Sequence, residues 1–183
     1  VDQQKKASRQ KKRTDKILCE YYLLAAITGK QNVEINKGLH HFFAEKGRLL
    51  YIHVEFERFD SRYRRLSETG RRECWWDLYK GLSQSLGNFR HHLISNVTKL
   101  GDTFDLGIVL TGKLLKSKGM DEYEYVEYLK NITQQIQVCP VSFYMGLKVD
   151  GIEQIALSYK SAIEASLQRH RDTGDTLLEQ IEA

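Results

Sequence analysis

Cysteine is scarce in this chain of 183 residues, which contains only three. Cys19, Cys74 and Cys139 are far apart and odd in number, and they form no paired-ligand spacing. We therefore expect neither a disulfide framework nor a structural zinc site, and a reducing cytoplasm is the natural setting for such a chain.

Long apolar runs are also missing. No uninterrupted run approaches the roughly 20 residues that cross a bilayer, and the first residues form no recognisable signal peptide. Proline occurs once, and 41% apolar with 28% charged residues is the composition of a globular protein. Because the chain begins with Val1, we expect a piece of a longer protein, either cytoplasmic or the cytoplasmic part of a membrane-attached one.

Positive charge is concentrated in the first sixteen residues, which supply much of the net charge of +4. The basic residues of this segment are Lys5, Lys6, Arg9, Lys11, Lys12, Arg13 and Lys16. Only Asp2 and Asp15 oppose them. Such a run can bind nucleic acid or an acidic membrane surface, but no aromatic residues are interleaved with it, so a solvated linker helix is the favoured interpretation. We expect no nucleic-acid partner and no membrane span in this segment.

The basic run continues without proline or glycine into an apolar segment, which predicts one helix up to about residue 28. Within it, Ile17, Tyr21, Leu24 and Thr28 follow a 4-3-4 spacing that can form a seam against a second helix. We predict that this helix pairs with a copy of itself or with a protein partner. Removing residues 1–16 should leave the remainder folded.

Three parts are predicted along the chain: a linker helix at 1–26, a globular domain at 27–172 and a C-terminal tail at 173–183. Hydrophobic periodicity within the domain gives strands at 50–57, 107–110 and 141–149 and helices at 60–86, 121–136 and after residue 151. Gly70 is expected to divide the first of these helices. This order predicts an α/β fold of the α+β type, in which helices cover an antiparallel-centred sheet.

A hairpin precedes the strand at 107–110. Gly101-Asp102 is a favourable tight-turn pair, and the segment that follows is apolar and β-branched. Asp102 should lie at the tip of the hairpin, near Glu55 of the strand at 50–57, where Glu55 and Glu57 share the polar face. A turn beside a sheet edge is a place where carboxylates can hold a metal ion.

The paired histidines do not predict a metal site. Neighbouring residues of a strand point to opposite faces, and His40-His41 and His91-His92 are accompanied by no Glu-x-x-His or His-x-x-x-His spacing.

Five segments, in order, resemble the GGDEF domain, the palm-like fold of bacterial diguanylate cyclases. Ile-Thr-Gly-Lys-Gln-Asn at 27–32 is similar to the family's opening Leu-Thr-Gly-Leu-x-Asn, and Glu-Phe-Glu-Arg-Phe at 55–59 to its Asp-x-Asp-x-Phe. Leu-Gly-Asp-Thr-Phe at 100–104 resembles the signature Gly-Gly-Asp-Glu-Phe. The segment at 141–147 resembles the family's late strand Val-x-x-Ser-x-Gly-Val, and 159–167 falls where the family has Ala-Asp-x-Ala-Leu-Tyr-x-Ala-Lys.

Glu55 and Asp102 stand where active members of that family hold two divalent ions against a nucleotide triphosphate. The resemblance therefore marks these two residues as vestigial metal candidates. Magnesium is the ion that it implies, although we expect no cofactor.

Other parts of the family's site are replaced. Leu100 stands at the signature's first glycine and Thr103 at its acidic fourth position. Arg71 replaces an aspartate that accepts from guanine, which an arginine cannot do because it has no acceptor. The guanine-binding asparagine falls near Arg62 or Tyr63, and the late phosphate-binding lysine aligns with Leu167. These losses argue against cyclase activity.

The resemblance implies a non-catalytic GGDEF-like module of a larger bacterial protein, which signals or scaffolds through protein contacts in a cyclic di-GMP pathway. The alternative is a sensor that binds GTP or cyclic di-GMP, or a divergent nucleotide cyclase, that uses Glu55 and Asp102.

Overall fold

The computed structural model describes residues 1–44, 46–95, 97, 99–100 and 103–182, and for 99–100, 103–104 and 173–182 it gives the course of the backbone. Its centre is a four-stranded antiparallel sheet in the order β2-β5-β1-β6. The strands are β1 (Leu49–Phe56), β2 (Leu93–Ile94), β5 (Leu106–Thr111) and β6 (Val141–Met145). A separate pair, β3 (Lys99–Leu100) with β4 (Thr103–Phe104), forms a small hairpin. The predicted mixed fold with an antiparallel sheet is confirmed.

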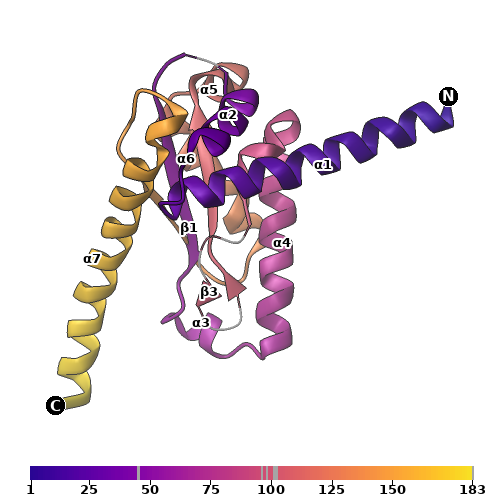
Figure 1. The fold of residues 1–183 in the computed structure, drawn as a ribbon. Coiled ribbons are helices and arrows are strands. Elements are labelled where there is room, and N and C mark those ends of the chain that lie inside the picture. The colour runs from indigo at the N-terminus through magenta and orange to yellow at the C-terminus, as the bar shows by residue number, and fades with distance from the viewer. Residues whose placement is uncertain (45, 96, 98, 101–102, 183) are drawn as a thin grey trace.

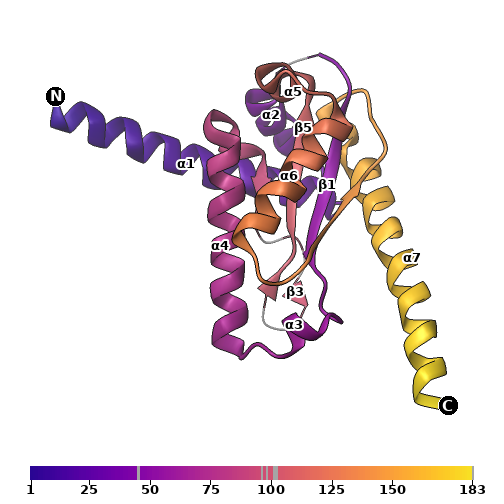
Figure 2. The ribbon, with the colours of Figure 1, turned by 180° about the vertical axis from the view of Figure 1, so that it is seen from behind.

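Helices lie on both faces of the sheet (Figures 1 and 2). They are α1 (Asp2–Ile27), α2 (Val33–Phe42), α3 (Ser61–Arg64), α4 (Glu68–Leu86), α5 (Gly112–Lys118), α6 (Glu122–Ile136) and α7 (Ile155–Glu182), with 3₁₀ turns η1 (Gly87–His92) and η2 (Ile152–Gln154). The long helix α4 connects β1 to β2, and α6 connects β5 to β6. Together with the strand order, this is the split β-α-β connectivity of ferredoxin-like units.

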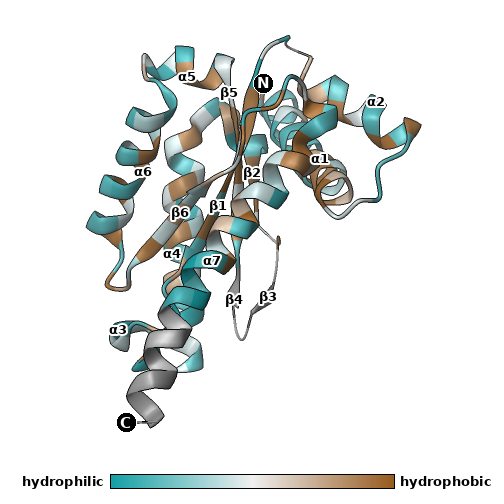
Figure 3. Ribbon diagram, turned by 90° about the vertical axis from the view of Figure 1, so that its left-hand side faces the viewer, coloured by the Kyte–Doolittle hydropathy of each residue, from teal (hydrophilic) through white to brown (hydrophobic). Residues whose placement is uncertain are grey.

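Side chains alternate across β1, so its residues supply both cores of the molecule. Leu50, Ile52, Val54 and Phe56 belong to one buried cluster with residues of α4 and α6. The opposite face belongs to a second cluster with residues of α1, α2 and α7. In Figure 3 the hydrophobic residues accordingly concentrate in the strands, between the helical layers.

The break in the segment at 60–86 lies before Gly70 rather than at it. The helix α3 ends at Arg64, and α4 starts after Ser67, whose hydroxyl accepts a hydrogen bond from the Gly70 amide. Serine is a preferred helix cap, and a glycine in the first turn is tolerated, so the cap rather than the glycine defines the boundary.

Both ends of the chain are helical. The first half of α1 extends away from the domain (Figure 1), whereas Cys19, Leu23, Ala26 and Ile27 are buried in the second core. The last third of the predicted linker is therefore packed into the domain. At the other end, the backbone of α7 continues as a helix through the predicted tail to Glu182. None of the described helices is both long and apolar enough to cross a bilayer.

Candidate functional site

A buried polar cluster lies on the second face of the sheet, where hydrophobic packing gives way to charge. His53 and Glu55 project from β1 on the same side as Tyr51, because residues two apart on a strand share a face. Asp105 immediately precedes β5, and Ser166 comes from α7. All five side chains are buried.

Glycine makes room for this cluster. Gly107 of β5 is the cross-strand partner of His53, and a Cβ atom at Gly107 would lie 2.5 Å from the Tyr51 ring and hydroxyl. The absence of a side chain lets Tyr51 lie over β5, where its hydroxyl is 3.0 Å from His53 Nδ1.

His53 is the centre of the cluster. Its Nε2 is 3.3 Å from Asp105 Oδ2 and 3.5 Å from Glu55 Oε2. The other carboxylate oxygen of Glu55 accepts hydrogen bonds from Ser166 Oγ at 2.9 Å and from His170 Nε2 at 2.7 Å. Two residues of α7, one helical turn apart, therefore hold the Glu55 carboxylate against the sheet.

These contacts shift the pKa values of both central groups. Burial works against protonation of His53, but hydrogen bonds to Asp105 and Glu55 outweigh it and raise the pKa of the imidazole above 6.5. Burial also opposes ionisation of Glu55, yet His53, Ser166 and His170 lower the pKa of its carboxyl to about 2. The cluster thus favours an imidazolium between two carboxylates, and both of its ring nitrogens then donate hydrogen bonds.

Arginines complete the charge balance. Arg58 Nη2 is 2.9 Å from Asp105 Oδ1, so Arg58 and His53 together match the two buried carboxylates. Immediately after β1, Glu57 pairs with Arg169 of α7 at 2.6 Å and accepts a hydrogen bond from Ser142 of β6. Each of the carboxylates at 55, 57 and 105 therefore has a cationic partner within the chain.

The geometry can be tested against a metal ion. His53, Glu55 and Asp105 each offer a ligand atom, and these atoms lie within 4.8 Å of one another. Magnesium, however, requires near-octahedral oxygen ligands. Here Glu55 Oε1 is hydrogen-bonded to α7, and Asp105 Oδ1 is paired with Arg58. The third donor is the His53 imidazole, which favours its protonated form. These residues do not fit magnesium. One imidazole with two carboxylates is a donor set for zinc, manganese or iron, and it would bind only after His53 loses its proton.

The structure describes some of the predicted site residues and not others. Glu55 lies on β1 as expected, but its carboxylate is enclosed. Asp102 lies outside the described residues, as do the side chains of Leu100 and Thr103, so the predicted pairing of Asp102 with Glu55 stays a prediction. Leu167 is 52% exposed, and its neighbour Ser166 is the α7 residue that faces Glu55.

Arg71 and Arg62, which the resemblance places near a guanine base, make contacts within the chain. The Arg71 guanidinium lies 4.9 Å from the centroid of the Tyr63 ring and donates to the carbonyl oxygens of Tyr63 and Arg64 at the end of α3. Arg62 forms an ion pair with Asp60, which caps the same short helix. Arg71 therefore links α4 to α3.

Sequence reasoning missed His53, Asp105 and His170. The period-two spacing of Tyr51, His53 and Glu55 was a usable signal, because it places a histidine beside the carboxylate on one strand face. Asp105 and His170 are far from β1 in sequence, and only the sheet register and the docking of α7 bring them to it.

Comparison with known proteins adds no relative: no protein-family model, no curated protein and no solved structure matches this chain. The likeness to the GGDEF domain therefore depends on the motif residues themselves.

Proposed function

We propose that this domain is a non-catalytic GGDEF-like signalling or scaffolding module that acts through protein contacts. The observation that carries the proposal is the enclosure of Glu55. Its carboxylate is buried, bonded to Ser166 and His170 of α7, and next to the His53 imidazole. A metal-nucleotide complex would have to displace these partners and part α7 from the sheet, and metal clamping with positioning is most of what phosphoryl-transfer catalysis requires.

The contact surface in this proposal is the outer side of α1. Ile17 and Tyr21 are 65% and 61% exposed, whereas Cys19 and Leu23 of the same helix are fully buried in the core. The helix therefore presents an apolar pair to a partner while its other side remains fixed to the domain. A second copy of the chain is the partner that we favour, because residues four apart on one helix can meet their own equivalents across a two-fold axis.

A second candidate function is a nucleotide sensor or divergent cyclase that uses Glu55 and Asp102. It is favoured by the three potential metal-ligand atoms of His53, Glu55 and Asp105, which lie close together at the end of β1.

The two functions separate in one set of measurements. The purified domain, alone and fused to a dimerising zipper, is incubated with GTP and either magnesium or manganese, and the same preparations are titrated calorimetrically with GTP and with cyclic di-GMP. The proposal expects no cyclic dinucleotide and no heat of binding that depends on Glu55. Product that accumulates and disappears in Glu55→Ala or Asp102→Ala would overturn it and establish the second candidate.

A further inference from the structure

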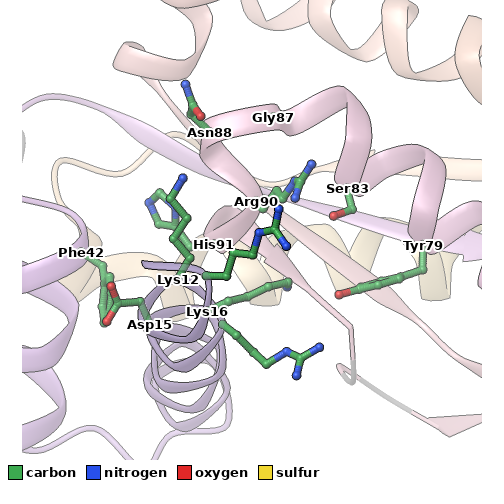
Figure 4. A pocket seen from close by; sticks show the side chains of 12 residues that line it. Lys12, Asp15, Lys16, Phe42, Tyr79, Ser83, Gly87, Asn88, Arg90 and His91 are labelled. Atoms are coloured by element: carbon green, nitrogen blue, oxygen red, sulfur yellow. The ribbon is translucent and has the colours of Figure 1, made fainter. Parts of the chain in front are cut away.

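A basic groove, which shares no lining residue with the polar cluster, lies between the exposed half of α1 and the junction of α4 with η1 (Figure 4). Its volume is about 750 Å³, within the range of sites that hold small ligands. The cationic residues that line it are Arg9, Lys12, Arg13, Lys16 and Arg90. Asp15 is the one carboxylate among the lining residues, so the groove carries an excess of four positive charges, five minus one.

Helical spacing explains this concentration of charge. Residues 9, 12, 13 and 16 of α1 follow the i, i+3, i+4, i+7 pattern that places side chains on one face of a helix. The groove is thus formed because this face of α1 is turned toward η1, which adds Arg90. Among the described residues, none forms an ion pair with the side chain of Arg9, Lys12, Arg13 or Arg90 or accepts a hydrogen bond from it.

Lys16 is the most informative of these cations. Its Nζ atom is buried and has no hydrogen-bond acceptor within the described part of the chain. It lies 5.5 Å from the centroid of the Tyr79 ring of α4, and Figure 4 shows Lys16 extending from α1 toward this ring. A buried ammonium without an acceptor is costly, and an anion in the groove would remove that cost.

His91 also lines the groove, and it adds no charge there. Burial, followed by the charges of Lys16 and Lys113, lowers the pKa of His91 below 6.5, so the imidazole is neutral at pH 7. Phe42 and Tyr79 add aromatic faces to the lining. The groove therefore combines an unbalanced positive charge with aromatic surface.

From these observations we propose that the groove binds a small nucleotide carrying two or three phosphates, with Lys16 donating to a phosphate oxygen. Several phosphate charges are needed to match an excess of four, and an aromatic lining suits a base. These five cations surround a single volume, which suits one small ligand. Lys5 and Lys6 extend the basic face of α1 beyond the groove, so a nucleic-acid strand is tested separately below. This site is independent of the proposed function, because neither Glu55 nor the seam of α1 takes part in it.

Calorimetric titration of the full chain with ATP, GTP, tripolyphosphate and orthophosphate tests the proposal. We expect nucleoside triphosphates to bind most tightly and orthophosphate least. Lys16→Met keeps an apolar chain of similar length over Tyr79 and should weaken nucleotide binding by about tenfold to a hundredfold, the loss expected for one charge-assisted hydrogen bond. Lys11→Met is the matched control, because it removes the same charge from α1 outside the groove and should change binding by less than about threefold.

Thermal unfolding shows that the variants are folded: Lys16→Met should melt no lower than the parent, since it removes a buried ammonium without an acceptor. Absence of nucleotide binding at about 1 mM, the weak end of specific affinity, would overturn the proposal. So would equal losses in the two variants. A single-stranded oligonucleotide that binds more tightly than its mononucleotide, with an affinity that depends on Lys16, would replace the small ligand with a nucleic acid.

Discussion

His53 shows how one residue couples the buried cluster to pH. Its pKa is raised in the folded state, so the stabilisation is fully present below the unfolded value of about 6.5 and is lost as pH rises through the folded value. Glu55 has the opposite sign: its pKa falls to about 2, and its contribution is lost as pH drops from about 4.5 toward that value. Both contributions are therefore present between about pH 4.5 and 6.5.

We predict that His53→Gln lowers the free energy of unfolding by on the order of 3 kcal/mol at pH 6, because it removes one partner from a buried charged group. The deficit should shrink at higher pH, with a slope of at most about 1.4 kcal/mol per pH unit. Urea denaturation of parent and variant from pH 5 to 9 gives this difference directly.

The exposed His41 provides the control, and His41→Gln should leave the pH profile unchanged. The titration of His92 does not change the difference in stability between parent and variant. Burial and then His91 lower its pKa to about 3, so its stabilisation is lost below about pH 6.5 in parent and variant alike. A deficit of constant size from pH 5 to 9 would mean that His53 is not the protonated bridge between the carboxylates.

At the scale of elements, the docking of α7 depends on a close approach to the backbone at the end of β6. A Cβ atom on Gly146 would lie 2.1 Å from the carbonyl oxygen of Ser158 in α7. The same glycine donates its amide to the Tyr51 carbonyl oxygen of β1 at 2.7 Å. Gly146 therefore cannot move away from the helix without losing its bond to the sheet.

We predict that Gly146→Ala destabilises the domain by roughly 1–3 kcal/mol, the usual cost of overpacking, and loosens α7. Chemical denaturation measures the first effect. Hydrogen exchange of the α7 amides should rise relative to those of α4, which measures the second. Gly112→Ala is the matched substitution, since a Cβ atom there meets nothing within 4 Å, and it should be neutral or slightly stabilising. Equal effects of the two substitutions would rule out the close approach as the cause.

Elements were predictable where local signals agreed. The strict alternation at 50–57 predicted β1. Hydrophobic periodicity predicted a helix at 121–136, and in α6 the Asp121 side chain caps the start by accepting from the Glu124 amide. The expected break at Gly70 was wrong because a serine cap three residues earlier determines where α4 begins.

The site was less predictable than the elements. Glu55 was identified because it lies in a motif on one strand, and its partner His53 lies on the same strand. Its other partners, Ser166 and His170, come from α7, and Asp105, which shares His53 with Glu55, precedes β5. The register of β1 with β5 and the position of α7 decide which distant side chains reach Glu55 and His53. Hydrophobic periodicity predicts neither the register nor the position of the helix. Long-range pairing of this kind depends on tertiary packing rather than on local preference.

At the scale of the whole molecule, α1 has two halves that contribute differently to stability. Residues 2–14 are exposed, whereas Cys19, Leu23, Ala26 and Ile27 are buried against the rest of the domain. The Cys19 thiol also donates to the carbonyl oxygen of His91 at 3.3 Å, and burial raises its pKa to about 12. The packed half is part of the fold, and the exposed half carries charge.

Two truncations should therefore behave differently. Removing residues 1–16 should change the free energy of unfolding by less than about 1 kcal/mol, because the lost residues are mostly solvated and contribute little apolar burial. Removing residues 1–27 takes four buried side chains from the second core. At about 2–5 kcal/mol for the loss of each large buried side chain, that change approaches the whole stability of a typical domain, so the shorter chain should fail to fold cooperatively.

Urea denaturation followed by tyrosine and tryptophan fluorescence distinguishes the two truncated chains. Cooperative unfolding of the 28–183 chain at the parent's midpoint would show that α1 is a separable linker throughout, whereas loss of cooperativity on removing 1–16 alone would show that its basic half also supports the fold.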